Sequence, residues 1–252
     1  MAKETSWGVV AGEYKDSFID KEGSYHATVI LPNLLRIVDP KPGMKILEVG
    51  CGDGYFASAF AEKGAEVVGS DIAREMIDHA KKREPKLEWH RAPADQLDFA
   101  KNNFFDTVVV VLALQNIENL SGAFAEAARV LKPGGSVVFV LNHPVFRIPK
   151  KSSWGFDEAM SMQYRRLDAY LSEFSEEIDM DPGKEFGKRT TISFHRPLQL
   201  YIKTLAKQGF GVVGFEEWIS NKKSQSGPRQ KAEDIARKEF PLFLMIKAQK
   251  LV

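Results

Sequence analysis

The feature that most constrains this chain is a set of alternating glycines directly after a short apolar stretch. Residues 45–49 predict a buried strand, and Gly50, Gly52 and Gly54 follow it. Glycine permits positive φ angles and lets the backbone approach a ligand closely. From Tyr55 the pattern becomes helical, and the free N–H groups of a helix start favour anions. The sequence therefore predicts a strand, a tight turn and a helix, with a ligand site at the turn.

The spacing of the glycines distinguishes between kinds of nucleotide site. A dinucleotide fingerprint, G-x-G-x-x-G, would need a glycine where Tyr55 stands, and the lysine of a phosphate-binding loop is missing. The pattern present is instead Glu48-x-Gly50-x-Gly52-x-Gly54. A pyrophosphate site is therefore disfavoured.

A second predicted strand, residues 65–70, ends in a carboxylate. Asp71 lies about 20 residues after the glycines, which is the spacing of a carboxylate that binds ribose. Such a carboxylate can accept a hydrogen bond from each of the two ribose hydroxyls. The turn and Asp71 together indicate a ligand that contains a ribose.

With three downstream segments added, the chain resembles the class I S-adenosylmethionine (SAM) dependent methyltransferases, in particular their small-molecule, type 11-like group. Residues 105–111 resemble the fourth strand of that family, residues 128–135 its helix and turn, and residues 136–141 its fifth strand. The resemblance implies an α/β fold with a Rossmann-like, seven-stranded, mostly parallel sheet, an antiparallel C-terminal strand and helices on both faces. It also implies an enzyme that moves a methyl group from SAM to an oxygen, nitrogen or carbon nucleophile of a small molecule, leaving S-adenosylhomocysteine.

The same resemblance implies cofactor contacts. Glu48 and the turn at 50–54 would hold the methionine end of SAM, Asp71 the ribose, and the backbone of Leu112 the sulfonium side. The complete set of expected cofactor residues is Glu48, Gly50, Cys51, Gly52, Gly54, Asp71, Ile72, Ala94, Asp95, Leu112, Tyr14 and Tyr25.

The segment that resembles the adenine loop departs from the family pattern. Pro93 stands where an acidic residue is usual, and proline also lacks a backbone N–H. We expect the backbone of Ala94 to meet the adenine edge. Asp95 either replaces the missing acid or lies in solvent.

Residues 1–40 precede the first strand, and residues 24–38 place apolar side chains at helical spacing. We interpret them as N-terminal capping helices. In the resembling family such elements fold over the cofactor, so Tyr14, Tyr25 and His26 are candidates for contact with cofactor or substrate. The alternative is that these aromatic side chains only anchor the leading helix.

Two histidines are the candidates for general base. His143 follows the fifth predicted strand, and residues at the carboxyl end of a central strand face the ligand crevice. The alternative is that His143 fixes its loop by a backbone hydrogen bond. His195, just before a predicted helix, is the second candidate. A base is required only where the acceptor is protonated.

The fourth predicted strand leads into Gln115 and Asn116, which we expect to orient substrate or cofactor. Asn116 alternatively caps the helix predicted over residues 121–131 or bonds locally in the turn. The motif Asn-Pro-Pro-Tyr of amino-methylating enzymes is missing here, and so is a Pro-Cys pair. Their absence argues against a base or amide nitrogen and against the cytosine carbon as acceptor.

An insertion at residues 147–191 is too long for a tight connection. We expect it to form a lid, with Trp154 and Tyr164 shaping the acceptor pocket and a possible helix over residues 164–174. The acidic run at residues 173–181 either attracts a cationic acceptor or, as we favour, forms a solvated face.

Composition limits the remaining classes. A 252-residue chain with 44% hydrophobic residues can form one domain over 1–252, and its net charge of +1 gives no global field for nucleic acid. One cysteine, Cys51, excludes a disulfide within the chain and a cysteine-rich metal site, and we expect no metal. Without a signal peptide or membrane-length apolar run, we expect a soluble, cytoplasmic protein with no membrane partner.

The basic residues between 220 and 239 predict a solvated loop and short helix. The alternative functions are an RNA or protein methyltransferase that docks through this loop, or a non-catalytic SAM-binding protein. The sequence carries no signal for the oligomeric state.

Overall fold

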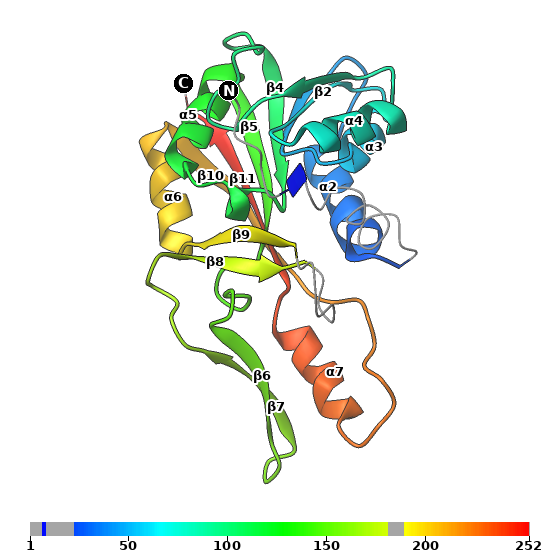
Figure 1. Cartoon of the computed structure of the whole chain (residues 1–252), viewed down its shortest axis with the longest axis vertical. Helices are drawn as coiled ribbons and strands as arrows, with labels where there is room; N and C mark the ends of the chain where they lie inside the picture. Colours follow the sequence, from blue (N-terminus) through cyan, green and yellow to red (C-terminus); the bar gives the residue numbers. More distant parts are fainter. Residues whose placement is uncertain (1–6, 9–22, 181–188, 252) are drawn as a thin grey trace.

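The computed structural model describes residues 7–8, 23–180 and 189–251. A seven-stranded sheet forms its centre, in the order β10-β11-β5-β4-β1-β2-β3 (Figure 1). The strands are β1 (Lys45–Val49), β2 (Glu66–Asp71), β3 (Glu88–Arg91), β4 (Phe105–Val111), β5 (Leu131–Asn142), β10 (Phe210–Trp218) and β11 (Phe243–Lys250). Neighbours from β3 to β5 pair in parallel, whereas β11 is antiparallel to both β5 and β10. The predicted Rossmann-like sheet is confirmed.

Helices cover both faces of the sheet because the central strands are apolar on both sides. In β4, Val109 and Val111 pack on one face, and Val108 and Val110 pack on the other. The first face carries the π-helical turn η2 (His26–Ile30) with α2 (Leu31–Val38), α3 (Tyr55–Ala61) and α4 (Arg74–Arg83). The second carries α5 (Leu120–Val130) and α6 (Leu198–Lys207), with the short turn η3 (Leu114–Asn116) between β4 and α5.

The segment expected to form a lid, together with the residues just after it, contains two antiparallel strand pairs. One is β6 (Ser152–Asp157) with β7 (Met162–Leu167), and the other is β8 (Phe174–Asp179) with β9 (Thr190–His195). A helix over residues 164–174 is therefore wrong. Side chains from Met162 to Arg166 in β7 alternate between exposed and half-buried, which is the period of a strand.

The β6–β7 hairpin and α7 (Gln230–Glu239) lie beside one another below the sheet in Figure 1. The pair β8–β9 lies between them and the sheet, across the ends of the central strands. Within the described ranges, no helix has both the length and the apolar composition needed to cross a membrane.

Candidate active site

The glycine turn lies at the carboxyl end of β1, with φ of +68° at Gly50, +54° at Gly52 and +81° at Gly54. A Cβ at Gly50 would approach the Cβ of Ala113 to 2.5 Å, and one at Gly54 would approach the ring of Trp89 to 2.5 Å. These two glycines are required by packing. A Cβ at Gly52 would meet no atom within 4 Å, so the middle of the turn presents bare backbone to open space.

Asp71, the last residue of β2, is bonded to this middle glycine. Its Oδ2 accepts the N–H of Gly52 at 3.0 Å, and its Oδ1 accepts the N–H of Ala73 at 2.9 Å. Burial raises the pKa of Asp71, although these N–H groups partly offset the effect. The structure thus brings Gly52 and Asp71 together and leaves lone pairs on both carboxylate oxygens for further donors. The adjacent Ile72 accepts the Nε–H of Arg91 through its carbonyl oxygen.

Glu48 lies in β1 just before the turn and is 1% exposed. Its Oε2 has no hydrogen-bond partner among the described residues. Burial raises the pKa of Glu48 well above its usual value, the backbone of Ala57 lowers it, and the nearby Asp53 and Asp71 raise it further. A buried carboxyl oxygen without a donor fits a cationic group, such as the ammonium at the methionine end of SAM.

This raised pKa predicts a pH-dependent stability change in Glu48→Gln. Between the usual glutamate pKa and the higher pKa of Glu48 in the folded protein, the folded protein holds a proton that the unfolded chain has lost. The contribution of Glu48 to the free energy of unfolding is therefore largest below the usual glutamate pKa. It falls as the pH rises toward the folded pKa. Because glutamine does not titrate, we expect Glu48→Gln to raise the free energy of unfolding by about 1 kcal/mol near pH 8. At pH 4 the variant should match the wild type.

Thermal melts at both pH values measure this effect, and about 1 kcal/mol corresponds to a shift of roughly 2–4 °C. Glu62→Gln, at an exposed position after α3, is the control and should change little at either pH. An equal difference between Glu48→Gln and wild type at both pH values would show that Glu48 does not titrate as inferred.

The segment after β4 forms a wall of the candidate site, beside the glycine turn, since Ala113 lies against Gly50. Leu112 has a φ of +52°, and its N–H donates to the carbonyl of Val140 in β5. Its own carbonyl accepts Nε2 of Gln115 at 2.5 Å, and Oε1 of Gln115 is buried without a partner among the described residues. Leu112 and Gln115 therefore act as one fixed unit.

Asn116 does not cap α5. Its Nδ2 donates to the carbonyl of Ile192 in β9, while Asn119 is the cap, its Oδ1 accepting the N–H of Gly122. Asn116 thus ties η3 to the β8–β9 pair, a contact between segments far apart in sequence that local patterns do not indicate.

The expected adenine loop is tied to the start of α5. Oδ2 of Asp95 accepts Nδ2 of Asn119 at 2.8 Å, so the carboxylate is neither fully solvated nor free of partners. Ala94, half-buried, packs against the core on the α5 face. Cys51 is buried in the turn, and burial raises the pKa of its thiol, which makes it an inert filler of the turn rather than a nucleophile.

His143 is 2% exposed and both of its ring nitrogens are engaged. Nδ1 accepts the N–H of Val145 at 3.2 Å, so the proton lies on Nε2, which bonds Oε1 of Glu217 at 2.8 Å. Burial lowers the pKa of His143, against the opposing effect of Glu217. The geometry favours the loop-fixing interpretation, because Glu217 of β10 occupies Nε2 and the loop N–H of Val145 occupies Nδ1.

His195 is likewise buried, at 3% exposed. Its Nε2 lies 2.7 Å from the carbonyl oxygen of Tyr170 and its ring packs on Phe174. This contact fixes the chain between β7 and β8 to the end of β9.

The remaining expected contacts are dispersed. Tyr25 bonds Ser220 Oγ at 2.8 Å, on the β11 side of the sheet, and the His26 ring lies 6.0 Å from that of Phe56. Trp154 and Tyr164 lie on the β6–β7 hairpin, away from the glycine turn (Figure 1). Tyr14 lies outside the described residues.

Two contributors to the site were missed by sequence reasoning. Arg196 is 6% exposed and donates to the carbonyl oxygens of Leu114, Ile117 and Glu118, so it fixes the whole segment after β4. Trp7 packs on Ala73 and Met76, directly beyond Asp71. No local signal marks either residue, since each depends on a distant contact.

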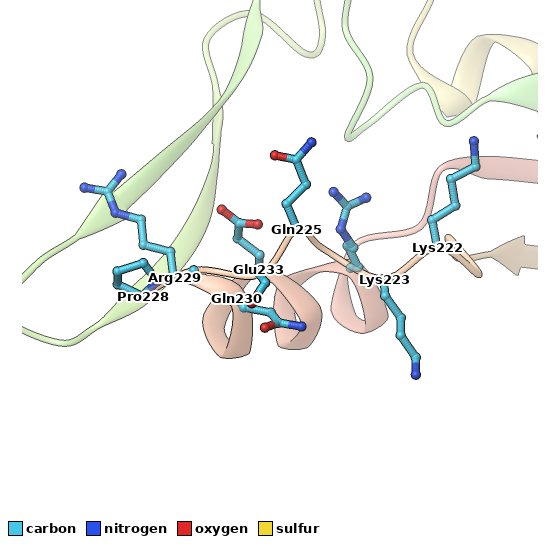
Figure 2. Close-up of a pocket in the computed structure, with 10 residues that line it drawn as sticks. Lys222, Lys223, Gln225, Pro228, Arg229, Gln230 and Glu233 are labelled. Carbon is cyan, nitrogen blue, oxygen red and sulfur yellow. The ribbon is translucent and has the colours of Figure 1, made fainter.

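The basic segment between 220 and 239 forms a hollow of about 640 Å³ between its loop and α7 (Figure 2). Arg229 pairs with Glu158 and stacks on the Phe156 ring, and Arg237 donates to Ser224 Oγ. Glu233 also lines the hollow. The positive charges around the hollow are thus partly compensated, which is in keeping with a solvated loop and short helix. In the described part of the chain, no three histidine, cysteine, aspartate or glutamate side chains are grouped to hold a metal ion.

Comparisons with known proteins match the chain to methyltransferases. A family model described as a methyltransferase domain matches residues 47–139, which run from β1 into β5 and include the glycine turn and Asp71. The crystal structure of an S-adenosylmethionine dependent methyltransferase from Mesorhizobium loti superposes with a TM-score of 0.67 at 26% identity. The superposition covers 86% of this chain and 96% of the Mesorhizobium loti chain.

Curated relatives are also similar to parts of this chain. A demethylmenaquinone methyltransferase of Renibacterium salmoninarum is 36% identical over 106 residues, or 42% of this chain and 44% of that protein. An uncharacterized protein of Haemophilus influenzae is 26% identical over 184 residues, or 69% of this chain and 67% of the relative. The chain spans less than half the length of the first relative.

Proposed function

We propose that the chain is a class I SAM-dependent methyltransferase, which binds SAM at the glycine turn and methylates a small-molecule acceptor. One observation carries the proposal: Asp71 is bonded to Gly52, whose bare backbone faces open space. The name of the Renibacterium relative supports a small molecule as acceptor.

The roles of the residues follow from their positions. SAM supplies an activated methyl group on its sulfonium, so the acceptor must be held in line with that methyl and water must be excluded. Asp71 would accept hydrogen bonds from the ribose hydroxyls of SAM. Oε2 of Glu48, which has no partner among the described residues, would accept one from the ammonium at the methionine end of SAM. Leu112 and Gln115 form the wall beside it, and Arg196 holds this wall in place.

The general-base roles of His143 and His195 remain proposals that the geometry does not favour. A ring nitrogen must be within reach of the acceptor proton to act as base. Both histidines instead use Nε2 for contacts within the fold. We propose that the acceptor is already ionised, or carries no proton on its nucleophile, at the working pH.

Ligand-linked stability tests the function. We expect SAM and S-adenosylhomocysteine, each at about a hundredfold excess over its Kd, to add roughly 2.7 kcal/mol, and NAD at the same concentration to add nothing. Thermal melts of the full chain measure this. S-adenosylhomocysteine formed from SAM in the presence of small-molecule extracts then reports turnover.

Each rival predicts a different outcome. A non-catalytic SAM-binding protein would be stabilised without turnover, and an RNA or protein methyltransferase would turn over only with macromolecular fractions and with strong salt dependence. Stabilisation by neither adenosyl ligand contradicts the proposed function itself.

A further inference from the structure

Among the described residues, two arginines that meet beyond the carboxyl end of β5 have no acidic partner: Arg147, and Arg165 of β7. Arg147 donates through Nη1 to Oδ1 of Asn142 at 2.6 Å, and Arg165 donates to the carbonyl of Phe146 and to Ser152 Oγ, each at 2.7 Å. All of these acceptors are neutral. Throughout residues 7–8, 23–180 and 189–251, no carboxylate forms an ion pair with either guanidinium.

Other arginines of the fold are paired differently. Six have a carboxylate within ion-pair distance, namely Arg36, Arg74, Arg83, Arg129, Arg166 and Arg229. Arg165 and Arg166 are neighbours in β7, yet only Arg166 has such a partner, Asp168 at 2.7 Å. Arg91, Arg196 and Arg237 also donate to neutral oxygens, so the absence of an acid is not by itself particular to this place. What Arg147 and Arg165 add is that the positive charge of one acts on the other.

The two guanidiniums also act on each other. Arg165 bonds the carbonyl of Phe146, the residue before Arg147, so β7 brings its charge next to the turn after β5. Desolvation by the surrounding chain and then the positive charge of Arg165 lower the pKa of Arg147, and Tyr25 raises it. Part of the Arg147 side chain is exposed. Like charges held together without an acid favour an anionic ligand.

The place adjoins the proposed methyl-transfer site. Asn142, which anchors Arg147, is the last residue of β5, and Leu112 of the neighbouring chain segment donates to Val140, two residues earlier. The Arg147 guanidinium lies 5.6 Å from the ring centre of Phe243, and the Tyr25 ring packs edge-on against that same ring. An apolar ring and a charged group thus lie side by side, one strand away from the wall at Leu112 and Gln115.

We propose that the methyl acceptor carries an anionic oxygen group, a carboxylate or a phosphate, which Arg147 binds at the carboxyl end of β5. Arg165 strengthens the local positive potential, and the half-buried Tyr25, which packs on the buried Phe243, contacts the apolar part of the same molecule. The inference rests on the proposed function, since it assigns a substrate class to that same site. The unused N–H groups of the guanidinium match the geometry of either anion.

The test uses the full chain saturated with S-adenosylhomocysteine and three probes: benzoate, inorganic phosphate and the neutral benzamide. Thermal melts over a concentration series give the apparent Kd of each probe. We expect benzoate or phosphate to stabilise the wild type and benzamide to have no effect. Comparing benzoate with phosphate identifies which anion the site takes.

Variants locate the effect. Arg147→Gln should lower the affinity for the anion by about ten- to a hundredfold, and Arg165→Gln should lower it by less. Arg166→Gln removes the same charge one residue away and should leave anion binding unchanged. Arg147→Lys, which keeps the charge, should retain part of the affinity and guards against a folding defect in Arg147→Gln.

Two results would overturn the inference: neither anion stabilises the wild type, or both anions act on Arg147→Gln as they act on the wild type. Stabilisation by S-adenosylhomocysteine is recorded before any anion is added, so a failure of the proposed function is seen separately.

Discussion

Asp71→Ala is expected to lose nearly all stabilisation by SAM. The carboxylate would accept both ribose hydroxyls, and a hydrogen bond to a charged group contributes about 1.5–3 kcal/mol. Losing two such bonds lowers affinity by more than about a hundredfold, so the expected gain of roughly 2.7 kcal/mol falls close to zero at the same SAM concentration. Thermal melts with and without SAM measure the difference.

The substitution also removes structural contacts, because Asp71 accepts the N–H groups of Gly52 and Ala73. Asp106→Ala is a matched control, since that carboxylate accepts the N–H of Lys45 and the ammonium of Lys132 at the opposite end of the sheet. Both variants should be less stable than the wild type, but only Asp71→Ala should lose the response to SAM. An unchanged response in Asp71→Ala would exclude it from the cofactor site.

Gly52→Ala is expected to give the second large effect. The added methyl group would project into the open space in front of the turn, where SAM is proposed to bind. One misplaced methyl group in a fitted site changes affinity by roughly 10- to 200-fold. Calorimetric titration with S-adenosylhomocysteine measures the loss.

A positive φ makes alanine strained at this position, so strain must be separated from obstruction. Gly43 provides the comparison, because it has a φ of +78° and a Cβ there also meets nothing within 4 Å. It lies in the turn before β1, away from the site. Both alanine variants should lose about 1–2 kcal/mol of stability, and only Gly52→Ala should lose affinity. Equal affinities would mean that the ligand does not approach Gly52.

The fold was predictable because its signals are local. Apolar strands that end in glycines or in a carboxylate give β1 and β2, and the order of strands and helices gives a parallel sheet with helices on both faces. The contact between Asp71 and Gly52 also follows, since adjacent parallel strands end at the same edge.

The candidate site was only partly predictable, because side-chain direction depends on distant partners. His143 was expected to face the crevice from the end of β5, yet Glu217, 74 residues later, holds its ring toward β10. Asn116 was considered as a helix cap and instead bonds Ile192, 76 residues away. In the insertion, alternation in β7 was missed because a short aromatic-rich segment fits either a helix or a strand.

The hairpin β6–β7 and α7 have a consequence for how the molecule opens. Ala236 is the one buried residue of α7, and the hairpin side chains are half-buried or exposed. The central sheet, by contrast, buries β5 and β11 on both faces. Amide hydrogens in the hairpin and α7 should therefore exchange with solvent through local opening, at much lower free energy than those of β5. Because Arg165 lies in this hairpin, each such opening would also carry its charge away from Arg147 and weaken the binding of an anionic acceptor while the sheet stays folded.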